Sequence, residues 1–171
     1  MIPLAGAGVV ARLERSNLVV RSFSCLLCRV GGMLCALALE HVEETMRPLP
    51  VEPLAGVPSF IQGLAVVRGI PTPVVDTALL LGGAASHPRQ PTRFVTVKAG
   101  TRRVALAVDT VVGVVAIPSS SVDALPPLFE NAGLTAIDTI GVLDAELLLV
   151  LHHTRLVPDE AWEAIQCGIK T

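Results

Sequence analysis

Short apolar runs that end in turn residues recur along this chain and constrain its fold more than any other feature. Residues 21–30 (RSFSCLLCRV) and 33–39 (MLCALAL) meet at a Gly-Gly pair, and residues 63–67 and 70–76 meet at Arg68-Gly69. Short runs rich in β-branched and other apolar residues, joined by glycine-containing turns, are typical of β-hairpins. The sequence therefore predicts a mainly β protein built from short strands.

The pattern of the first half of the chain recurs in the second half. Residues 93–98 and 104–108 match the first hairpin, and residues 140–143 and 147–151 match the second one. Between the two copies, residues 82–91 (GGAASHPRQP) contain several chain breakers and no apolar periodicity. The chain is therefore predicted to contain two similar β units.

Each unit is predicted to be a five-stranded, SH3-like β-barrel, so that the chain forms two barrels in tandem. We expect a poorly ordered N-terminus at residues 1–20, a first barrel at 21–82 and a second barrel at 92–157. A barrel of roughly 70 residues is marginally stable alone, so the two are expected to pack on each other. Residues 158–169 begin with proline and two acids and carry an apolar stripe, which predicts a C-terminal helix.

The composition excludes several classes of protein. Apolar residues make up 51% and charged residues 16% of the chain, which excludes disorder as its overall state. A net charge of −2 and an aromatic content of 3% argue against nucleic-acid binding. No apolar run approaches the roughly 18 to 20 residues of a membrane helix, and no positive segment precedes the apolar start. We therefore expect a cytoplasmic protein with reduced cysteines.

The cysteines raise the question of a metal or redox site. Cys25 and Cys28 have the CxxC spacing of zinc and redox centres, and two further cysteines lie at Cys35 and Cys167. Residues three apart in a strand point to opposite faces, however, and there is no second CxxC. We therefore predict no metal and no cofactor, and leave a metal-binding or small-molecule-binding regulator as the alternative.

Catalytic motifs are missing from the sequence. It contains no G-x-S-x-G, no glycine-rich phosphate loop and no H-E-x-x-H. The candidate acids Glu44, Asp76 and Asp109 each end a strand-like run, where such residues commonly support turns. The sequence favours a binding module over an enzyme.

Six short segments of this chain form an ordered set of motifs. They are residues 42–44 (VEE), 58–63 (PSFIQG), 63–69 (GLAVVRG), 73–76 (PVVD), 79–82 (LLLG) and 108–115 (VDTVVGVV). In order, these segments resemble V-x-E, P-x-x-h-x-G (h, apolar), G-x-x-N-L-R-G, P-V-x-D-L, L-G and V-D-x-V-x-x-V, the signature of the CheW family, the coupling proteins of bacterial chemotaxis. The resemblance covers about residues 21–157.

The resemblance implies two five-stranded barrels and a non-catalytic adaptor in a two-component system. Family members join the histidine kinase CheA, through its regulatory domain, to the cytoplasmic tips of methyl-accepting chemotaxis receptors. Membrane association would then come from these partners and not from insertion. The low charge leaves an adaptor of a pilus or surface-motility pathway as a second possibility.

The resemblance also implies which residues contact partners. The positions that it places at or beside partner-binding surfaces are Val42, Glu44, Val67, Arg68 and Ile70. The planar guanidinium of Arg68 is suited to bind a partner carboxylate through two parallel hydrogen bonds. Where the family has asparagine, this chain has Val66, which removes a polar group from the predicted contact.

Overall fold

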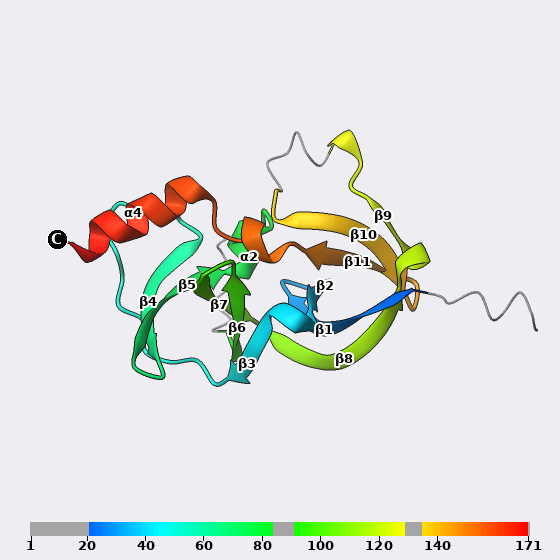
Figure 1. Ribbon diagram of the computed structural model, residues 1–171, viewed down its shortest axis with the longest axis horizontal. Helices are drawn as coiled ribbons and strands as arrows, with labels where there is room; N and C mark the ends of the chain where they lie inside the picture. Colours follow the sequence, from blue (N-terminus) through cyan, green and yellow to red (C-terminus); the bar gives the residue numbers. More distant parts are fainter. Residues whose placement is uncertain (1–20, 84–90, 129–134, 171) are drawn as a thin grey trace, which may run out of the picture.

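The protein is a mainly β structure made of two curved sheets, which confirms the predicted fold class. The computed structural model describes residues 21–83, 91–128 and 135–170 (Figure 1). The predicted poorly ordered N-terminus, residues 1–20, lies outside the described residues.

The larger sheet has six strands in the order β8-β1-β2-β11-β10-β9. These strands are β1 (Ser22–Val30), β2 (Met33–Ala38), β8 (Thr110–Pro118), β9 (Val122–Ala124), β10 (Ile137–Leu143) and β11 (Glu146–Leu151). All neighbouring strands in it are antiparallel except β2 and β11, which are parallel.

The smaller sheet has five strands in the order β3-β6-β7-β5-β4. These strands are β3 (Val42–Met46), β4 (Ile61–Val67), β5 (Ile70–Asp76), β6 (Arg93–Ala99) and β7 (Arg102–Val108). Here β5 and β7 form the parallel pair.

Short helical segments connect the strands, and one longer helix ends the described chain. They are η1 (Leu39–His41), α2 (Thr77–Leu80), η2 (Ser119–Ser121), η3 (His153–Arg155) and α4 (Asp159–Ile169). Helix α4 confirms the predicted C-terminal helix, and its buried residues include Trp162 and Ile165. None of the helices in the described part of the chain has the length and apolar character needed to span a bilayer.

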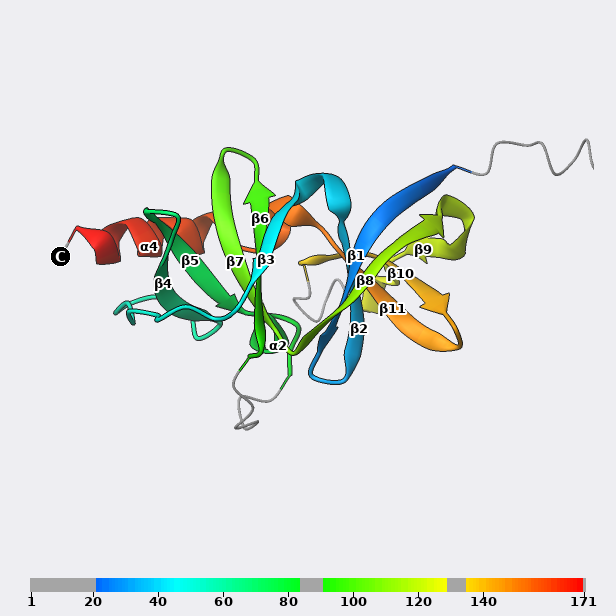
Figure 2. The ribbon, with the colours of Figure 1, turned by 90° about the horizontal axis from the view of Figure 1, so that it is seen from below.

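The two sheets do not coincide with the two halves of the chain. The β1–β2 hairpin pairs with β8 and β11 from the second half, and the β6–β7 hairpin pairs with β3 and β5 from the first (Figure 2). The expected barrel boundaries at 21–82 and 92–157 therefore do not follow the sheets. The repeat itself is present, because β8-β1-β2-β11-β10 and β3-β6-β7-β5-β4 have equivalent orders. Turn residues specify a hairpin locally, but they carry no information about the sheet that the hairpin joins.

The largest hydrophobic cluster connects the two sheets. It contains side chains from both of them and from helix α4, among them Leu37, Leu106 and Trp162. Two smaller clusters lie within single sheets, one around Leu148 in the six-stranded sheet and one around Phe94 in the five-stranded sheet. Burial of each large apolar side chain stabilises the fold by about 1.5–3 kcal/mol, so the shared cluster holds the sheets together.

A glycine in each half permits a close crossing of two chain segments. The segment after β3 pairs with the edge of β4 through two hydrogen bonds between Glu52 and Leu64, of 2.8 and 2.9 Å. A Cβ atom on Gly63 would lie 2.0 Å from the carbonyl oxygen of Glu52, and one on Gly141 would lie 2.6 Å from that of Ser121. Only glycine allows these approaches, and the crossing at Gly63 also covers part of an exposed sheet edge.

Candidate partner-binding site

An ion pair between Arg68 and Glu44 lies at the tip of the β4–β5 hairpin. The Nε atom of Arg68 donates to Oε1 of Glu44 at 2.8 Å, and its Nη2 atom donates to Oε2 at 2.7 Å. This is the two-point geometry in which a guanidinium binds a carboxylate most strongly. We expected the guanidinium of Arg68 to bind a carboxylate of a partner. In the structure it binds the carboxylate of Glu44 in the same chain.

The ion pair joins the two edges of the five-stranded sheet. Glu44 lies on β3, the first strand of the sheet order, and Arg68 directly follows β4, the last one. Arg68 and Gly69 have positive φ angles of 49° and 79°, as in the tight turns that suit the twist of a hairpin. The turn thus places the guanidinium where it can reach the opposite edge of the sheet.

The ion pair also fixes the charge state of both groups. Hydrogen bonding to Arg68 is the main cause that holds the pKa of Glu44 below its ordinary value, and the charge of Arg68 acts in the same direction. Hydrogen bonding to Glu44 raises the pKa of Arg68. Because the Arg68 side chain is 75% exposed, this charged group is also open to a partner.

The structure separates the five predicted contact residues into exposed and buried ones. Ile70 is 50% exposed beside the turn, but Val67 is only 1% exposed, so its side chain is not available to a partner. Val42 is half-buried and packs against the cluster shared by the sheets. Sequence reasoning missed Val66 as a candidate contact, because it treated this residue only as a lost asparagine; its side chain is 63% exposed. We call Glu44, Val66, Arg68 and Ile70 the hairpin-tip surface.

A second ion pair and a pocket lie beside the hairpin tip. Glu43 accepts a hydrogen bond from Nη2 of Arg103 at 3.2 Å and also contacts its Nε atom. A pocket of about 520 Å³ is lined by these two residues, by Ile70 and by Trp162, whose ring lies 4.8 Å below the guanidinium of Arg102. The hairpin-tip surface therefore continues into a polar hollow with one aromatic wall.

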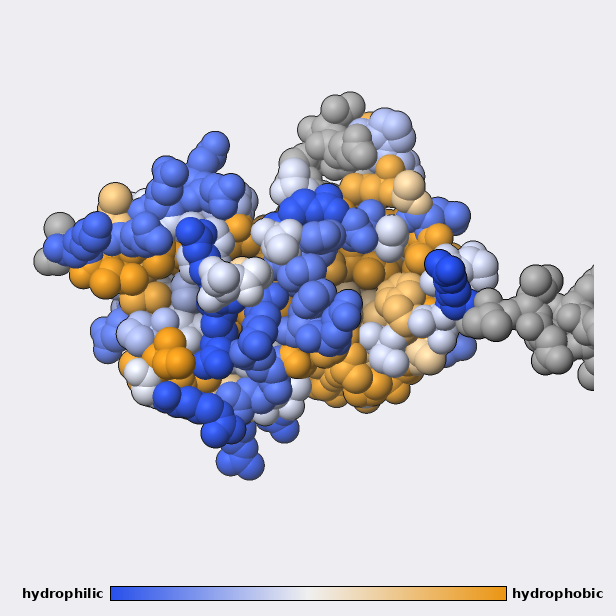
Figure 3. Space-filling model, in the orientation of Figure 1, coloured by the Kyte–Doolittle hydropathy of each residue, from blue (hydrophilic) through white to orange (hydrophobic). Residues whose placement is uncertain are grey.

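Strand β8 carries a separate exposed apolar surface on the six-stranded sheet. Val112 and Val114 are 54% and 57% exposed and alternate with less exposed neighbours along this edge strand. In Figure 3 an apolar area lies over β8, in the lower part of the view. Exposed apolar patches on a folded domain commonly mark interaction sites. We call Val112 and Val114 the β8 surface.

Three of the four cysteines, Cys25, Cys28 and Cys35, are core residues, whereas Cys167 is exposed. Cys25 packs in the cluster of the six-stranded sheet, whereas Cys28 and Cys35 pack in the shared cluster, so the CxxC pair faces two different sides. Burial raises the pKa of Cys25 to about 11 and those of Cys28 and Cys35 to about 12. Within the described ranges, no group of three or more His, Cys, Asp or Glu side chains could hold a metal ion.

These observations define a class of protein: a β-rich module without a metal cluster in its described residues, with an exposed charged hairpin tip on one sheet and an exposed apolar edge strand on the other. The particular family follows from the whole sequence. The chain belongs to the CheW-like domain family, whose family model matches residues 24–161. This is a family of scaffold and adaptor proteins without catalytic activity.

Individual relatives agree with this assignment. The chain is 31% identical to protein FrzA of Myxococcus xanthus over 151 residues, which cover 85% of this chain and 90% of FrzA. It is 31% identical to protein PilI of Pseudomonas aeruginosa, with 71% of this chain and 67% of PilI covered. It is 21% identical to chemotaxis protein CheW of Rhizobium meliloti, with 80% and 88% covered.

A solved structure shares the fold. The crystal structure of scaffolding protein TtCheW from Thermoanaerobacter tengcongensis superimposes with a TM-score of 0.71. The two sequences are 19% identical, and the match covers 82% of this chain and 96% of that one.

Proposed function

We propose that this protein is an adaptor that couples a chemoreceptor to a histidine kinase in a chemosensory pathway. The observation that carries this proposal is the hairpin-tip surface, where the ordered Arg68–Glu44 ion pair lies between exposed Val66 and Ile70 in a CheW-like fold. Apolar side chains beside a rigid charged group are typical of protein interfaces. In this proposal the hairpin-tip surface contacts the regulatory domain of the kinase.

An adaptor needs a second contact surface, and the β8 surface is suited to this role. It lies on the other sheet, and its two exposed valines offer apolar area to a partner. The shared hydrophobic cluster packs the two sheets against each other, so an adaptor of this kind would hold its two partners on one packed unit. We assign the β8 surface to the helical cytoplasmic tip of the receptor.

The pathway proposed is one of surface motility and not classical chemotaxis. Support comes from the relatives, because FrzA and PilI, whose names do not refer to chemotaxis, are 31% identical to this chain, whereas the protein named for chemotaxis is 21% identical. Val66 at the position of the family's asparagine also supports a partner with a more apolar contact surface. The variant Val66→Asn tests this point, because it should shift binding from the kinase of the protein's own pathway toward a chemotaxis kinase.

The adaptor role is tested by calorimetry with purified components. The protein is titrated with the regulatory domain of each CheA-type kinase from its own cell, and separately with receptor hairpin fragments. Arg68→Glu should weaken kinase binding at least tenfold while circular dichroism stays unchanged. Val112→Asp should instead weaken receptor binding and leave kinase binding intact.

The chain contains a matched control for Arg68→Glu. Arg29 on β1 also forms a two-point ion pair, with Glu146 on β11: its Nη1 atom donates to Oε1 at 2.8 Å and its Nη2 atom donates to Oε2 at 2.7 Å. Arg29→Glu removes an equivalent ion pair from the six-stranded sheet and should not weaken kinase binding. Equal losses for the two variants would mean that Arg68 acts only through stability. If the unmodified protein bound no kinase and no receptor, the adaptor proposal would be wrong.

A further inference from the structure

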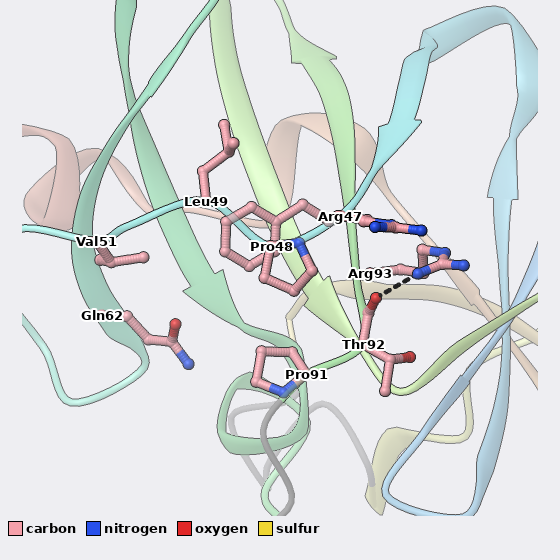
Figure 4. Close-up of a pocket in the computed structure, with 9 residues that line it drawn as sticks. Arg47, Pro48, Leu49, Val51, Gln62, Pro91, Thr92 and Arg93 are labelled. Carbon is pink, nitrogen blue, oxygen red and sulfur yellow. Dashed lines mark hydrogen bonds between the residues drawn. The ribbon is translucent and has the colours of Figure 1, made fainter.

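A pocket lies at the end of the five-stranded sheet that is farthest from the hairpin tip. Its volume is about 620 Å³, and its walls come from the start of β4, the start of β6 and the segment after β3 (Figure 4). The apolar lining includes Leu49, Val51 and Phe94, of which Phe94 is buried and packs in the cluster of the five-stranded sheet. A hollow of this size with an apolar floor is typical of small-molecule sites.

Two arginines stand at one side of this pocket. Arg47 and Arg93 both line it, and both side chains are exposed. Met46 pairs with Phe94 across β3 and β6. Arg47 directly follows Met46 and Arg93 directly precedes Phe94, so both arginines lie at the same end of this antiparallel pair. Figure 4 shows the two guanidiniums on the same side of the pocket.

Within the described residues, no carboxylate compensates the positive charge at this side of the pocket. Arg93 donates to the carbonyl oxygen of Thr92 at 2.8 Å, and no carboxylate in the described parts of the chain pairs with Arg47 or Arg93. Two guanidiniums on the same side of a hollow, with no carboxylate of the described residues paired to them, offer N–H donors and positive charge to an anion.

We propose that this pocket binds a small carboxylate with an apolar chain. The carboxylate lies between Arg47 and Arg93, which offer planar forks of N–H donors. The apolar chain enters the hollow against Leu49, Val51 and Phe94 and leaves water. Inorganic anions use only the first contact and neutral apolar molecules only the second, so neither binds as tightly.

The site is distinct from the surfaces assigned to the adaptor role. None of its lining residues belongs to the hairpin-tip surface or to the β8 surface. The pocket is built into the five-stranded sheet, and its floor residue Phe94 shares a cluster with Ala65 on β4. A ligand here would therefore bind to the same sheet that carries the proposed kinase contact, from its opposite end.

The inference is tested by calorimetric titration with matched small molecules. Octanoate should bind at least tenfold more tightly than acetate, 1-octanol or octylammonium, because only octanoate has both parts. A carboxylate with an apolar chain can belong to a fatty acid, which octanoate represents, or to the C-terminal residue of a polypeptide, which N-acetyl-leucine represents. The tighter of octanoate and N-acetyl-leucine identifies the source, and binding of neither overturns the proposal.

Variants separate the two contacts. The double variant Arg47→Gln/Arg93→Gln should weaken octanoate binding at least tenfold, and Val51→Thr should weaken octanoate binding severalfold while keeping the residue volume. The control is Arg21→Gln, which removes an exposed arginine outside the pocket and should change nothing. Both arginines of the double variant are exposed, so the fold should persist, which thermal unfolding checks. Equal octanoate affinity in the double variant and the Arg21 control would overturn the proposal.

Discussion

His41 and His153 stack face to face, with their ring centroids 3.4 Å apart and an angle of 20° between the ring planes. His41 ends η1, which links β2 of the larger sheet to β3 of the smaller one, and His153 begins η3, which links β11 to helix α4. His152 lies 4.9 Å from His153, and Glu40 lies 3.4 Å from Nε2 of His41. The stack thus joins the segments by which the chain leaves the larger sheet.

The stack predicts that stability falls in mild acid. Burial lowers the pKa of His153, and the nearby His41 and His152 lower it further, although Glu40 opposes them. Below the ordinary histidine pKa of about 6.5, the unfolded chain takes up a proton that the folded chain resists. The free energy of unfolding should therefore decrease as the pH falls from 7.5 to 5.5, as measured by urea denaturation. A His153→Gln variant should lose part of this pH dependence, and a variant with an unchanged profile would contradict the prediction.

The Arg68–Glu44 ion pair predicts a further loss of stability at low pH. Because Arg68 lowers the pKa of Glu44, the ion pair stabilises the fold above the ordinary carboxyl pKa. This contribution is lost as the pH falls through the lowered value. In Arg68→Gln the pKa of Glu44 should rise toward its ordinary range, which a side-chain carboxyl NMR titration measures. Glu146, which pairs with Arg29, is the internal reference and should not move.

Gly63 predicts a large effect of a single methyl group. The residue combines a φ of 145° with a site where a Cβ would lie 2.0 Å from backbone, so Gly63→Ala should lower the free energy of unfolding by more than about 2 kcal/mol. Gly32 has a φ of 83° but open space around it, and Gly32→Ala should cost only about 1 kcal/mol. Unfolding can be followed by the fluorescence of Trp162, the sole tryptophan of the chain. If the two variants lost equal amounts of unfolding free energy, the positive φ angle alone, and not the close approach to Glu52, would account for the effect.

Thiol labelling distinguishes the four cysteines. Cys25, Cys28 and Cys35 are buried with raised pKa values, whereas Cys167 is exposed. Because the thiolate is the reactive form, an aromatic disulfide reagent at pH 8 should modify one thiol quickly and three only on unfolding. Cys167→Ser should remove the fast phase. A fast phase that survives this change would show that a strand of the larger sheet opens readily.

The local part of the fold was predictable from the sequence, and the pairing of distant segments was not. Each hairpin could be predicted from two apolar runs joined by a turn such as Gly31-Gly32 or Arg68-Gly69. The repeat predicted in the two halves is present in the strand orders of the two sheets. The β1–β2 hairpin joins strands of the second half, and the β6–β7 hairpin joins strands of the first half. This exchange of hairpins depends on contacts such as that of β1 with β8, which are far apart in the chain. No local propensity encodes that choice.

The candidate site divides in the same way. Arg68 and Glu44 could be singled out by their positions in ordered motifs, but their mutual ion pair required the sheet to curve. The burial of Val67 could not be predicted, because the run from Ala65 to Val67 is entirely apolar and does not reveal which face is buried. The pocket beside Arg47 and Arg93 left no sequence signal, because its walls come from separate segments.

The exchange of hairpins has a mechanical consequence. A pull on the hairpin tip is transmitted through β4 and β5 to β7, which the chain connects directly to β8 at the edge of the other sheet. Neither half of the polypeptide holds a complete sheet, so cutting the chain between the halves would leave two fragments that need each other to fold. A force applied at the hairpin-tip surface is therefore transmitted to the β8 surface through strands that pair across the two halves of the chain.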